Sequence, residues 1–355
     1  MDDGRPPGQA AGEDGRKRRA RPGEGAIRMR DVAERAGVSA MTVSRALNTP
    51  DRVSPAIRRR VEEAVGAIGY VPNRLAGSLS SSRSNVAGLV VPSIRNTLFS
   101  DTIQGISDVL HGHGYHLMVA DSAYSPQEEE ALVTAFLAQR VAGLVLHNTT
   151  HTPALRALIR RSGVPVVENG TLADDPLDMV VSYSNVDAAR AMTLHLVRLG
   201  YRRIALVTLP LANNERSLER RRGHAAALAE AGLPADPRIM LEMPPGLPSG
   251  CEAIMRLLEI TPAVDAVFFA GDVLAVGALL ECQRRGVAVP GRIAIASFDD
   301  VDLLRHLNPG ITTVRLPRRE VGRRSAEILL DRIAGRSQER VRVDLGFEII
   351  QRAST

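Results

Sequence analysis

Cysteine and long apolar runs are scarce in this chain of 355 residues, and each scarcity excludes a class of protein. No apolar run approaches the roughly 18 to 20 residues that a membrane-spanning helix needs. The first 27 residues are rich in Gly, Pro, Arg and acidic side chains and contain no apolar leader segment. Cys251 and Cys282 lie far apart in unrelated surroundings, unlike a disulfide framework or a metal site. We expect a cytoplasmic protein without a membrane partner, metal or cofactor.

The positive charge is concentrated at the N-terminal end. Residues 1–83 contain 16 Lys or Arg and 10 Asp or Glu, a net charge of +6, and the remaining residues contain 29 and 30, a net charge of −1. Because binding to DNA phosphates requires clustered cations, this asymmetry predicts a nucleic-acid-binding head on a nearly neutral body. Lys17 is the only lysine, so a single arginine is weak evidence of function in this chain.

Composition and periodicity divide the chain into four expected segments. Residues 1–27 predict a disordered tail, because Gly, Pro and charge dominate there. Residues 28–70 predict a domain of short helices, and residues 71–84 have the composition of a linker with one helix-sized interruption. Residues 85–355 predict a two-lobed core. The basic run at residues 16–19 either contacts DNA phosphates or is part of a solvated tail.

The head contains signals for three short helices. The first ends at Gly37, the second begins after Ser39 as N-cap and runs to about Leu47, and the third opens at Ser54-Pro55 and ends at Gly69. A helix-turn-helix also needs a small residue inside its first helix, a Gly at the turn and apolar packing positions in its second helix. Ala33, Gly37, Val43 and Leu47 meet these needs.

The core alternates apolar runs of strand length with amphipathic helical segments. Strands that are apolar on both faces indicate parallel sheets covered by helices. The series is too long for one sheet, so we expect two doubly wound lobes, about 85–184 with 316–343 and about 185–315 with 344–355. In such sheets, ligands bind beyond the carboxyl ends of the strands. The expected strands cover residues 86–91, 117–120, 142–146, 164–167, 180–183, 204–208, 266–270 and 293–298.

Three sequence segments carry a specific resemblance. Arg30–Asn48 (RDVAERAGVSAMTVSRALN), Val53-Ser54 and Gly69–Ala76 (GYVPNRLA) resemble the head and hinge of the LacI/GalR family of transcriptional regulators. The resemblance implies an N-terminal all-α head with a hinge helix and an α/β core of the periplasmic-binding-protein-like type. It also implies a homodimer that binds double-stranded palindromic operator DNA and a small-molecule effector.

The resemblance assigns roles along the recognition helix. The base-reading positions fall on Ala40, Met41 and Arg45. Arg45 can donate two hydrogen bonds to guanine, and the other two offer apolar contact, for instance to a thymine methyl. Neighbouring polar residues are expected to contact phosphates. For each hydroxyl, the alternative is that it only caps a helix or stabilises a turn. These phosphate-contact candidates are Arg28, Ser39, Thr42, Ser44, Asn48, Arg52 and Ser54.

The hinge is too short to be stable alone. A helix over residues 73–80 falls below the roughly 12 residues at which isolated helices become marginal, so it needs partners. By the resemblance, two such segments pair in the minor groove and Leu79 wedges between base pairs, although plain linker packing of Leu79 remains open. The minor-groove candidates are Asn73, Arg74, Ala76 and Leu79.

The resemblance continues across the core with looser motifs. Gly271–Ala278, Ser297–Asp300, a turn at Thr312-Thr313-Val314 and Leu330–Ile333 match the family's effector-binding core. Other short sequence segments, among them Val166-Val-Glu168 and Asp344–Phe347, resemble segments of the gluconate-utilisation repressors of this family. We therefore expect a repressor of gluconate or sugar-acid utilisation genes. The alternatives are a regulator that answers to another sugar, a corepressor or a partner protein.

By the same resemblance, the effector contacts Leu98, Phe99, Arg220 and Asp272. Phe99 can cover an apolar C–H face, Arg220 can fork onto a carboxylate or a hydroxyl pair, and Asp272 can accept from vicinal hydroxyls. Arg220 lies in the run Glu219–Arg222, which is alternatively a solvated helix face, and Asp272 is alternatively only a helix cap. The sequence leaves induction and corepression open.

The sequence lacks the motifs that the alternative functions would require. An enzyme is disfavoured because the chain has no phosphate-cradling Gly-rich loop with Lys, no paired metal-ligand spacing and no nucleophile elbow. His111 and His113 are more typical of a helix-ending loop than of a metal site. A sugar-binding protein without DNA function would have no use for the head.

Overall fold

The structure is a computed structural model that describes residues 27–71, 84–337 and 339–355. The chain divides into two compact units, residues 1–82 and 83–355. Residues 1–26 of the predicted tail (residues 1–27) lie outside the described residues, as do the hinge candidates Asn73, Arg74, Ala76 and Leu79. No helix in the described part of the chain is both long and apolar enough to span a membrane.

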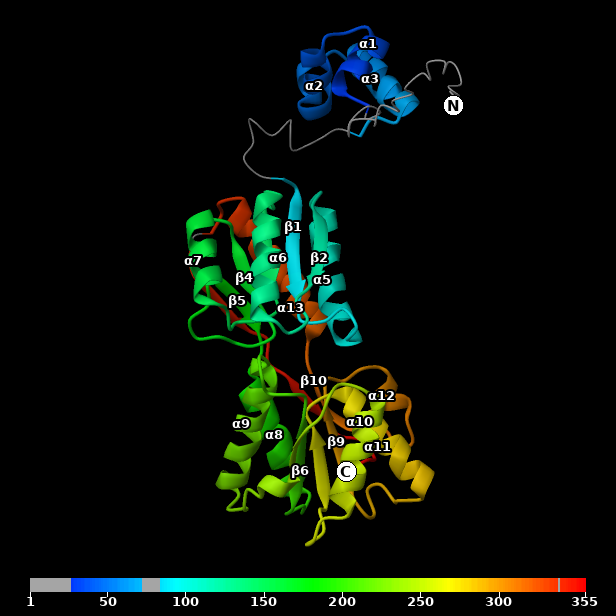
Figure 1. Ribbon diagram of the computed structural model, residues 1–355, viewed down its shortest axis with the longest axis vertical. Coiled ribbons are helices and arrows are strands. Elements are labelled where there is room, and N and C mark those ends of the chain that lie inside the picture. The colour runs from blue at the N-terminus through cyan, green and yellow to red at the C-terminus, as the bar shows by residue number, and fades with distance from the viewer. Residues whose placement is uncertain (1–26, 72–83, 338) are drawn as a thin grey trace, which may run out of the picture. The chain divides into compact units, whose positions relative to one another are not determined.

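The first unit is the predicted helical head (Figure 1). The first helix ends at Gly37, whose φ of 63° is left-handed, and the third ends at Gly69 in the same way with a φ of 67°. The second helix begins after Ser39, whose Oγ accepts a hydrogen bond from the backbone N–H of Thr42 at 3.1 Å. Ser54 caps the third helix similarly. The elements are α1 (Met29–Ala36), α2 (Ala40–Asn48), a 3₁₀ turn (Pro50–Arg52) and α3 (Pro55–Ile68).

The three helices share one apolar centre. Val32, Val43 and Val61, one from each helix, have no exposed surface. Tyr70, just after α3, packs against the same cluster. This packing confirms the helix-turn-helix and fixes which face of α2 is left on the surface.

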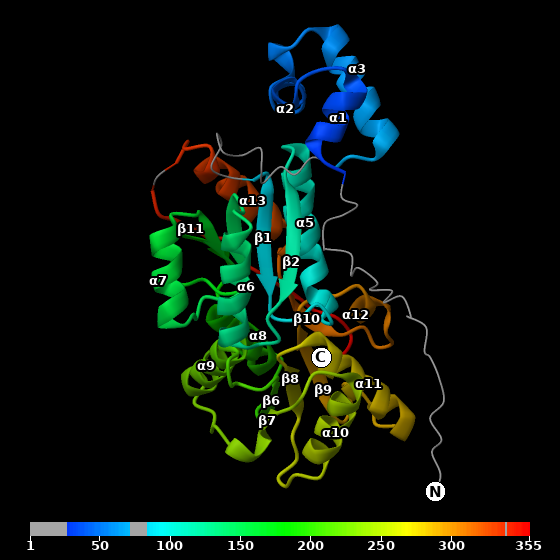
Figure 2. The same cartoon turned by 45° about the horizontal axis from the view of Figure 1, so that its top comes forward.

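The first lobe of the core is a six-stranded parallel sheet in the order β11-β5-β4-β3-β1-β2. α5 and α13 pack on one face of it, and α6 and α7 pack on the other. Figure 2 shows α5 and α13 next to each other beside β1 and β2. The elements are β1 (Val86–Val91), a 3₁₀ turn (Thr97–Phe99), α5 (Ser100–Gly112), β2 (His116–Asp121), α6 (Pro126–Ala138), β3 (Gly143–Leu146), α7 (Pro153–Ser162), β4 (Val166–Glu168), β5 (Met179–Ser182), α13 (Arg318–Ile333) and β11 (Val341–Asp344).

The second lobe repeats this architecture with the strand order β12-β10-β9-β8-β6-β7. All neighbours are parallel except β10 and β12. α8 and α9 cover one face, and α10 and α11 cover the other. The elements are α8 (Asn185–Arg198), β6 (Ile204–Thr208), α9 (Glu215–Glu230), a 3₁₀ turn (Pro237–Ile239), β7 (Met240–Glu242), α10 (Leu247–Leu258), β8 (Ala266–Phe269), α11 (Asp272–Arg285), β9 (Ala294–Phe298), α12 (Leu303–His306), β10 (Thr312–Arg315) and β12 (Glu348–Ile350).

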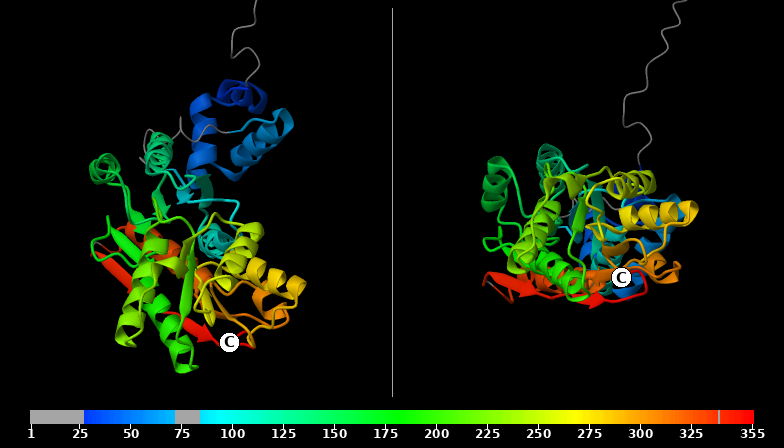
Figure 3. Two further views of the ribbon diagram at one scale, coloured as in Figure 1. Left: turned by 60° about the horizontal axis from the view of Figure 1, so that its bottom comes forward. Right: turned by 90° about the horizontal axis from the view of Figure 1, so that it is seen from below.

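Three segments join the lobes: the chain after β5, the chain after β10 and the chain between β11 and β12. Figure 3 shows β11 and β12 as successive red strands near the C-terminus. Because the chain passes between the lobes three times, each lobe is built from more than one stretch of sequence. The carboxyl ends of strands from the first lobe therefore lie near the start of elements in the second lobe.

One local prediction was wrong. Thr312-Thr313-Val314 was expected to form a turn, but these residues belong to β10 and are fully buried. The Thr312 hydroxyl donates to the backbone oxygen of Arg352 at 3.1 Å, so a residue far along the chain satisfies this polar group.

Candidate functional site

Helix α2 turns the three predicted base-reading side chains outward. Ala40, Met41 and Arg45 are exposed, and Met41 is 64% exposed although it is apolar. Val43 and Ala46, on the opposite face, are buried in the head. The exposed face therefore offers one guanidinium beside two apolar side chains.

The predicted phosphate-contact residues are placed around this face. Ser39 and Ser54 have capping roles, and the Ser39 Oγ also lies 2.9 Å from the Thr42 Oγ1. Capping and DNA contact do not exclude each other, because a hydroxyl that accepts a hydrogen bond as a cap still has its own O–H, which can donate to a phosphate oxygen. Arg28, Ser39, Arg52 and Ser54 are exposed, Thr42 and Ser44 are half-buried, and the side chain of Asn48 is outside the description.

Arg60 is a residue of the head that sequence reasoning missed. Its Nη2 donates to the backbone oxygens of Ala36 at 2.5 Å and Gly37 at 3.4 Å. It therefore satisfies carbonyls at the end of α1 and ties α3 to the turn before α2. Its neighbours Arg58 and Arg59 are exposed, and nothing in the sequence distinguishes Arg60 from them.

A narrow cleft lies between the two lobes of the core. Its volume is only about 10 Å³. Three of the four predicted effector residues, Leu98, Phe99 and Arg220, line it, whereas Asp272 does not. The complete lining is Leu98, Phe99, Thr102, His147, Gly170, Tyr183, Arg216, Arg220, Arg318 and Val321.

Arg220 is held firmly at the base of this cleft. Its Nε donates to the Asn185 Oδ1 and its Nη1 to the Ala270 oxygen, both at 2.9 Å. The guanidinium lies 3.7 Å from the ring centroid of Phe298. Arg220 is buried and Arg221 is exposed, so the alternative of a solvated helix face does not hold for Arg220.

Two further arginines share the cleft, and the sequence analysis missed both. Arg216 donates from Nη1 to the backbone oxygen of His147 at 2.8 Å. Arg318 lies with its Nη1 3.4 Å from the Asp299 Oδ1 and its Nη2 3.5 Å from an oxygen of Asp101. The cleft lining thus contains three guanidinium groups and no carboxylate.

One buried carboxylate stands behind these arginines. Asp299, 1% exposed, lies 3.5 Å from the Arg220 Nη1 and also pairs with Arg318. Asp272 lies near enough to feel this charge, because burial and then the Asp299 carboxylate raise the pKa of Asp272 to about 6. Asp272 therefore lies outside the lining of the cleft, although the charge of Asp299 still influences it.

The remaining polar groups of the cleft are uncharged. Burial, followed by the charges of Arg216 and Arg220, keeps the pKa of His147 well below its ordinary value, so the imidazole is neutral. Burial and Asp299 raise the pKa of Tyr183 to about 12, so the phenol keeps its proton. His147 packs edge-on against Phe99 with ring centroids 4.6 Å apart. Neutral hydrogen-bond donors and acceptors of this kind can bind the hydroxyl groups of a ligand.

Several buried polar atoms at the cleft have no hydrogen-bond partner of standard length and angle among the described residues. They include the Arg318 Nε and both polar atoms of the Asn169 side chain, which follows β4. Buried polar groups in native proteins are almost always satisfied, by water or ligand where protein groups are absent. These atoms therefore mark the cleft as a place for a polar ligand.

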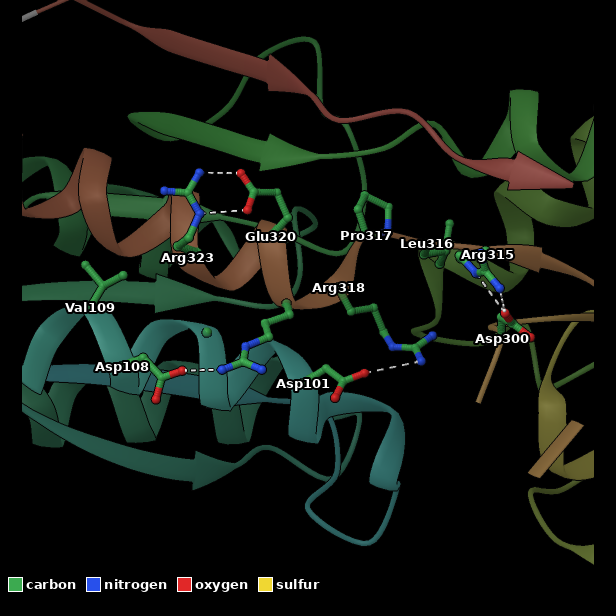
Figure 4. Close-up of a pocket in the computed structure, with 12 residues that line it drawn as sticks. Asp101, Asp108, Val109, Asp300, Arg315, Leu316, Pro317, Arg318, Glu320 and Arg323 are labelled. Atoms are coloured by element: carbon green, nitrogen blue, oxygen red, sulfur yellow. Dashed lines mark hydrogen bonds and ion pairs between the residues drawn. The ribbon is translucent and has the colours of Figure 1, made fainter. Parts of the chain in front are cut away.

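A larger groove of about 670 Å³ lies beside α5 and α13. Figure 4 shows that its charged side chains pair with one another. Arg319 binds Asp108 and Arg315 binds Asp300, both at 2.8 Å. Arg315 and Arg319 are exposed to solvent, whereas the three arginines of the cleft are buried, so water screens the charges of this groove more and it offers a ligand less than the smaller cleft does.

The sequence contains patterns that could have identified the cleft residues missed above. Arg216 precedes Arg220 by four residues, so both lie on the same face of one helix. His147 follows β3 directly and Asp299 follows β9 directly, at the carboxyl ends of parallel strands where ligands bind. Within the described residues, no group of three or more His, Cys, Asp or Glu side chains is arranged to hold a metal ion.

Comparisons with known proteins match the two parts of the chain to known families. Residues 28–73 match the bacterial regulatory proteins of the lacI family, and residues 193–355 match the periplasmic binding protein-like domain. The HTH-type transcriptional regulator GntR of Escherichia coli K12 is 38% identical over 321 residues, which are 90% of this chain and 96% of the relative.

Solved structures give the same result. A LacI family transcriptional regulator from Silicibacter pomeroyi superposes with a TM-score of 0.86 at 32% identity, covering 92% of this chain and 99% of that one. The Lac repressor dimer bound to operator and the anti-inducer ONPF gives a TM-score of 0.79 at 26% identity, covering 93% and 99%.

Proposed function

The chain belongs to the lacI family of bacterial regulatory proteins, and from this we propose that it is a homodimeric repressor that a sugar acid releases from its operator. A DNA-binding head and an effector-binding core are the two parts that such a regulator needs, and the chain has both. In this proposal, the chain binds DNA and a small molecule, needs no cofactor and catalyses no reaction.

The observation that carries the effector class is the cleft lining with three arginines and no carboxylate. Guanidinium groups bind carboxylates through paired, charge-assisted hydrogen bonds, which are stronger than bonds to neutral hydroxyls. The neutral His147 and Tyr183 suit the hydroxyls of the same ligand. Phe99 and Leu98 suit its C–H face.

The narrowness of the cleft supports a switch. A volume of about 10 Å³ has room for about one water molecule and not for a sugar acid, so we propose that the effector binds a conformation in which the lobes stand further apart. A ligand that binds one conformation better shifts the equilibrium toward it. We propose that the shift separates the two hinges of the dimer, so that Leu79 and its partners leave the minor groove and operator affinity falls.

The edge of the first sheet supports the homodimer. β2 is the last strand of that sheet, and its apolar Met118 and Val119 are 43% and 41% exposed. Sheet edges with exposed apolar side chains are unfavourable in a lone protomer and are usually covered. A second copy related by a two-fold axis would cover this edge and would place two heads on a palindromic site.

In the proposed complex, α2 lies in the major groove. Arg45 donates to a guanine edge, while Ala40 and Met41 contact the apolar parts of neighbouring bases. The polar residues around α2 and the first turn of α3 bind phosphates, which fixes the register of the helix.

Calorimetry with a matched pair of ligands tests the effector class. D-gluconate and D-sorbitol share a six-carbon polyol chain and differ in the carboxylate. We expect D-gluconate to bind and to release an operator duplex in a fluorescence-anisotropy assay, and D-sorbitol to do neither at the same concentration. Equal binding of the two ligands would exclude a role for the arginines in reading the carboxylate.

A further inference from the structure

Helix α9 also touches the first lobe through side chains that do not line the cleft. Glu215, in its first turn, accepts two hydrogen bonds through its carboxylate, one from the backbone N–H of Thr149 at 2.7 Å and one from that of Thr150 at 2.8 Å. One turn later, the Glu219 Oε2 accepts from the Thr171 hydroxyl at 3.0 Å. All three partners belong to loops of the first lobe, so these bonds span the two lobes.

The loop that Glu215 grips, residues 147–152 between β3 and α7, is anchored firmly in its own lobe. The side chain of His151 is completely buried, with its Nδ1 2.7 Å from Glu129 and its Nε2 3.1 Å from Glu168. The Asn148 Nδ2 donates to Glu129 at 3.1 Å. A loop fixed in this way transmits the position of its lobe, so its bonds to Glu215 resist separation of the lobes, together with the bonds that Arg216 and Asn185 make to the first lobe.

The same loop forms one wall of the cleft. His147 lines the cleft, and its backbone oxygen accepts from Arg216, which lines the opposite wall. A ligand that occupies the space between these walls has to move them apart. The residue next to Arg216 on α9 is Glu215, whose two bonds hold the walls together.

We propose that Glu215 is a positioning residue that keeps the cleft narrow when no effector is present, so that effector binding has to break its two hydrogen bonds. The inference rests on the proposed function, because it takes a sugar acid as the ligand. The apparent affinity of a ligand is reduced by the fraction of protein in the competent conformation. Weakening the Glu215 contact should therefore increase effector affinity, which is the opposite of the effect expected for a ligand-contacting residue.

The test compares Glu215→Gln with Glu230→Gln in the full-length protein. Glutamine has the shape of glutamate but no charge and only one acceptor oxygen, so at least one of the two N–H bonds is lost. Charge-assisted hydrogen bonds are strong enough for their loss to change an equilibrium about tenfold. We expect D-gluconate to bind E215Q about tenfold more tightly than the wild type in calorimetry. Equal or weaker binding to a folded E215Q overturns the proposal.

Glu230 is the matched control. It lies on the same helix, it is exposed, and its carboxylate pairs at 2.6 Å with Arg190 of the same lobe. E230Q should therefore leave the affinity for D-gluconate at the wild-type value. An equal gain in E215Q and E230Q would indicate a general effect of charge on α9 and would overturn the assignment to Glu215.

Hydrogen exchange provides a readout that does not depend on the effector. In the absence of ligand, the amides of Thr149 and Thr150 should exchange faster in E215Q than in the wild type, and at the wild-type rate in E230Q. Unchanged exchange in E215Q overturns the inference, whether or not D-gluconate binds. If D-gluconate gives no heat with the wild type and exchange nevertheless rises in E215Q, the sugar-acid proposal fails and the interlobe contact stands.

Discussion

His151 lies between two carboxylates inside the first lobe, on the loop that Glu215 contacts. Burial alone would lower its pKa, but hydrogen bonds to Glu129 and Glu168 outweigh burial and raise the pKa to about 9. Burial also raises the pKa of Glu168, although the hydrogen bond and the charge of His151 act in the opposite direction. Both residues therefore hold protons more tightly in the folded protein than in the unfolded chain.

This arrangement predicts a core whose stability falls in mildly alkaline solution. The contribution of His151 is fully present below its unfolded pKa of 6.5 and is lost as the pH rises to about 9. Linkage then predicts a loss of about 2 to 3 kcal/mol of unfolding free energy over that window. Urea denaturation at intervals from pH 6.5 to 9 measures it. His151→Gln should be less stable at pH 6.5 and should show a flatter pH dependence.

The exposed His113 supplies the comparison for that measurement. Its Nδ1 contacts only the backbone oxygen of Val109 at the end of α5. His113→Gln should keep the wild-type pH dependence. A wild-type slope in H151Q would show that other groups account for the alkaline loss.

Burial also explains which site residues could be predicted from the sequence. Leu98, Phe99 and Arg220 were found because the family resemblance pointed to them, and all three line the cleft. Arg318 was not found, because its partners Asp101 and Asp299 are distant in sequence and only the fold brings them together. The DNA, hinge and effector assignments remain predictions.

At the scale of elements, α5 and α13 approach closely because each has a glycine at the contact. A Cβ built on Gly322 would lie 2.1 Å from the backbone oxygen of Thr102, and one on Gly105 would lie 2.2 Å from that of Arg319. These neighbours are backbone atoms, which cannot rotate away as a side chain can. The two helices would therefore have to separate to admit a methyl group.

Gly322→Ala should consequently destabilise the core even though alanine favours helix. Overpacking at a tight contact costs about 1 to 3 kcal/mol or more, which exceeds the gain of roughly 1 kcal/mol in helix propensity. Thermal unfolding of the full-length protein should show a lower midpoint. Gly112→Ala is the control, because no atom lies within 4 Å of a Cβ at the end of α5. It should be neutral or stabilising, and a stable G322A would contradict the close approach.

The strands differ in how far the sequence predicts them. Eight strands were expected within a few residues, most of them because burial on both faces leaves continuous apolar runs such as Val86–Val91. β7, β11 and β12 were not expected, since they have three or four residues and are partly exposed. β10 was mistaken for a turn because its buried threonines are satisfied by partners from the C-terminal segment.

At the scale of the whole molecule, the predicted recognition of DNA and the predicted recognition of an effector fall in separate compact units, residues 1–82 and 83–355. In the proposed function, one conformational equilibrium of the core serves both. Operator DNA favours the narrow cleft, and the effector favours the wide one. The two ligands must then oppose each other through the same free energy, because coupling between sites is reciprocal.

Reciprocity predicts that the effector and the operator weaken each other's binding by the same factor. Saturating D-gluconate should weaken binding of an operator duplex by a factor typical of such coupling, roughly 5- to 150-fold. Saturating duplex should weaken binding of D-gluconate by the same factor, because each ligand draws protein away from the conformation that the other prefers. Anisotropy titrations with and without gluconate give the first factor, and calorimetry with and without duplex gives the second. Because reciprocity holds for any route of coupling, the outcome that would contradict the proposed switch is a factor of one, in which saturating D-gluconate leaves operator affinity unchanged.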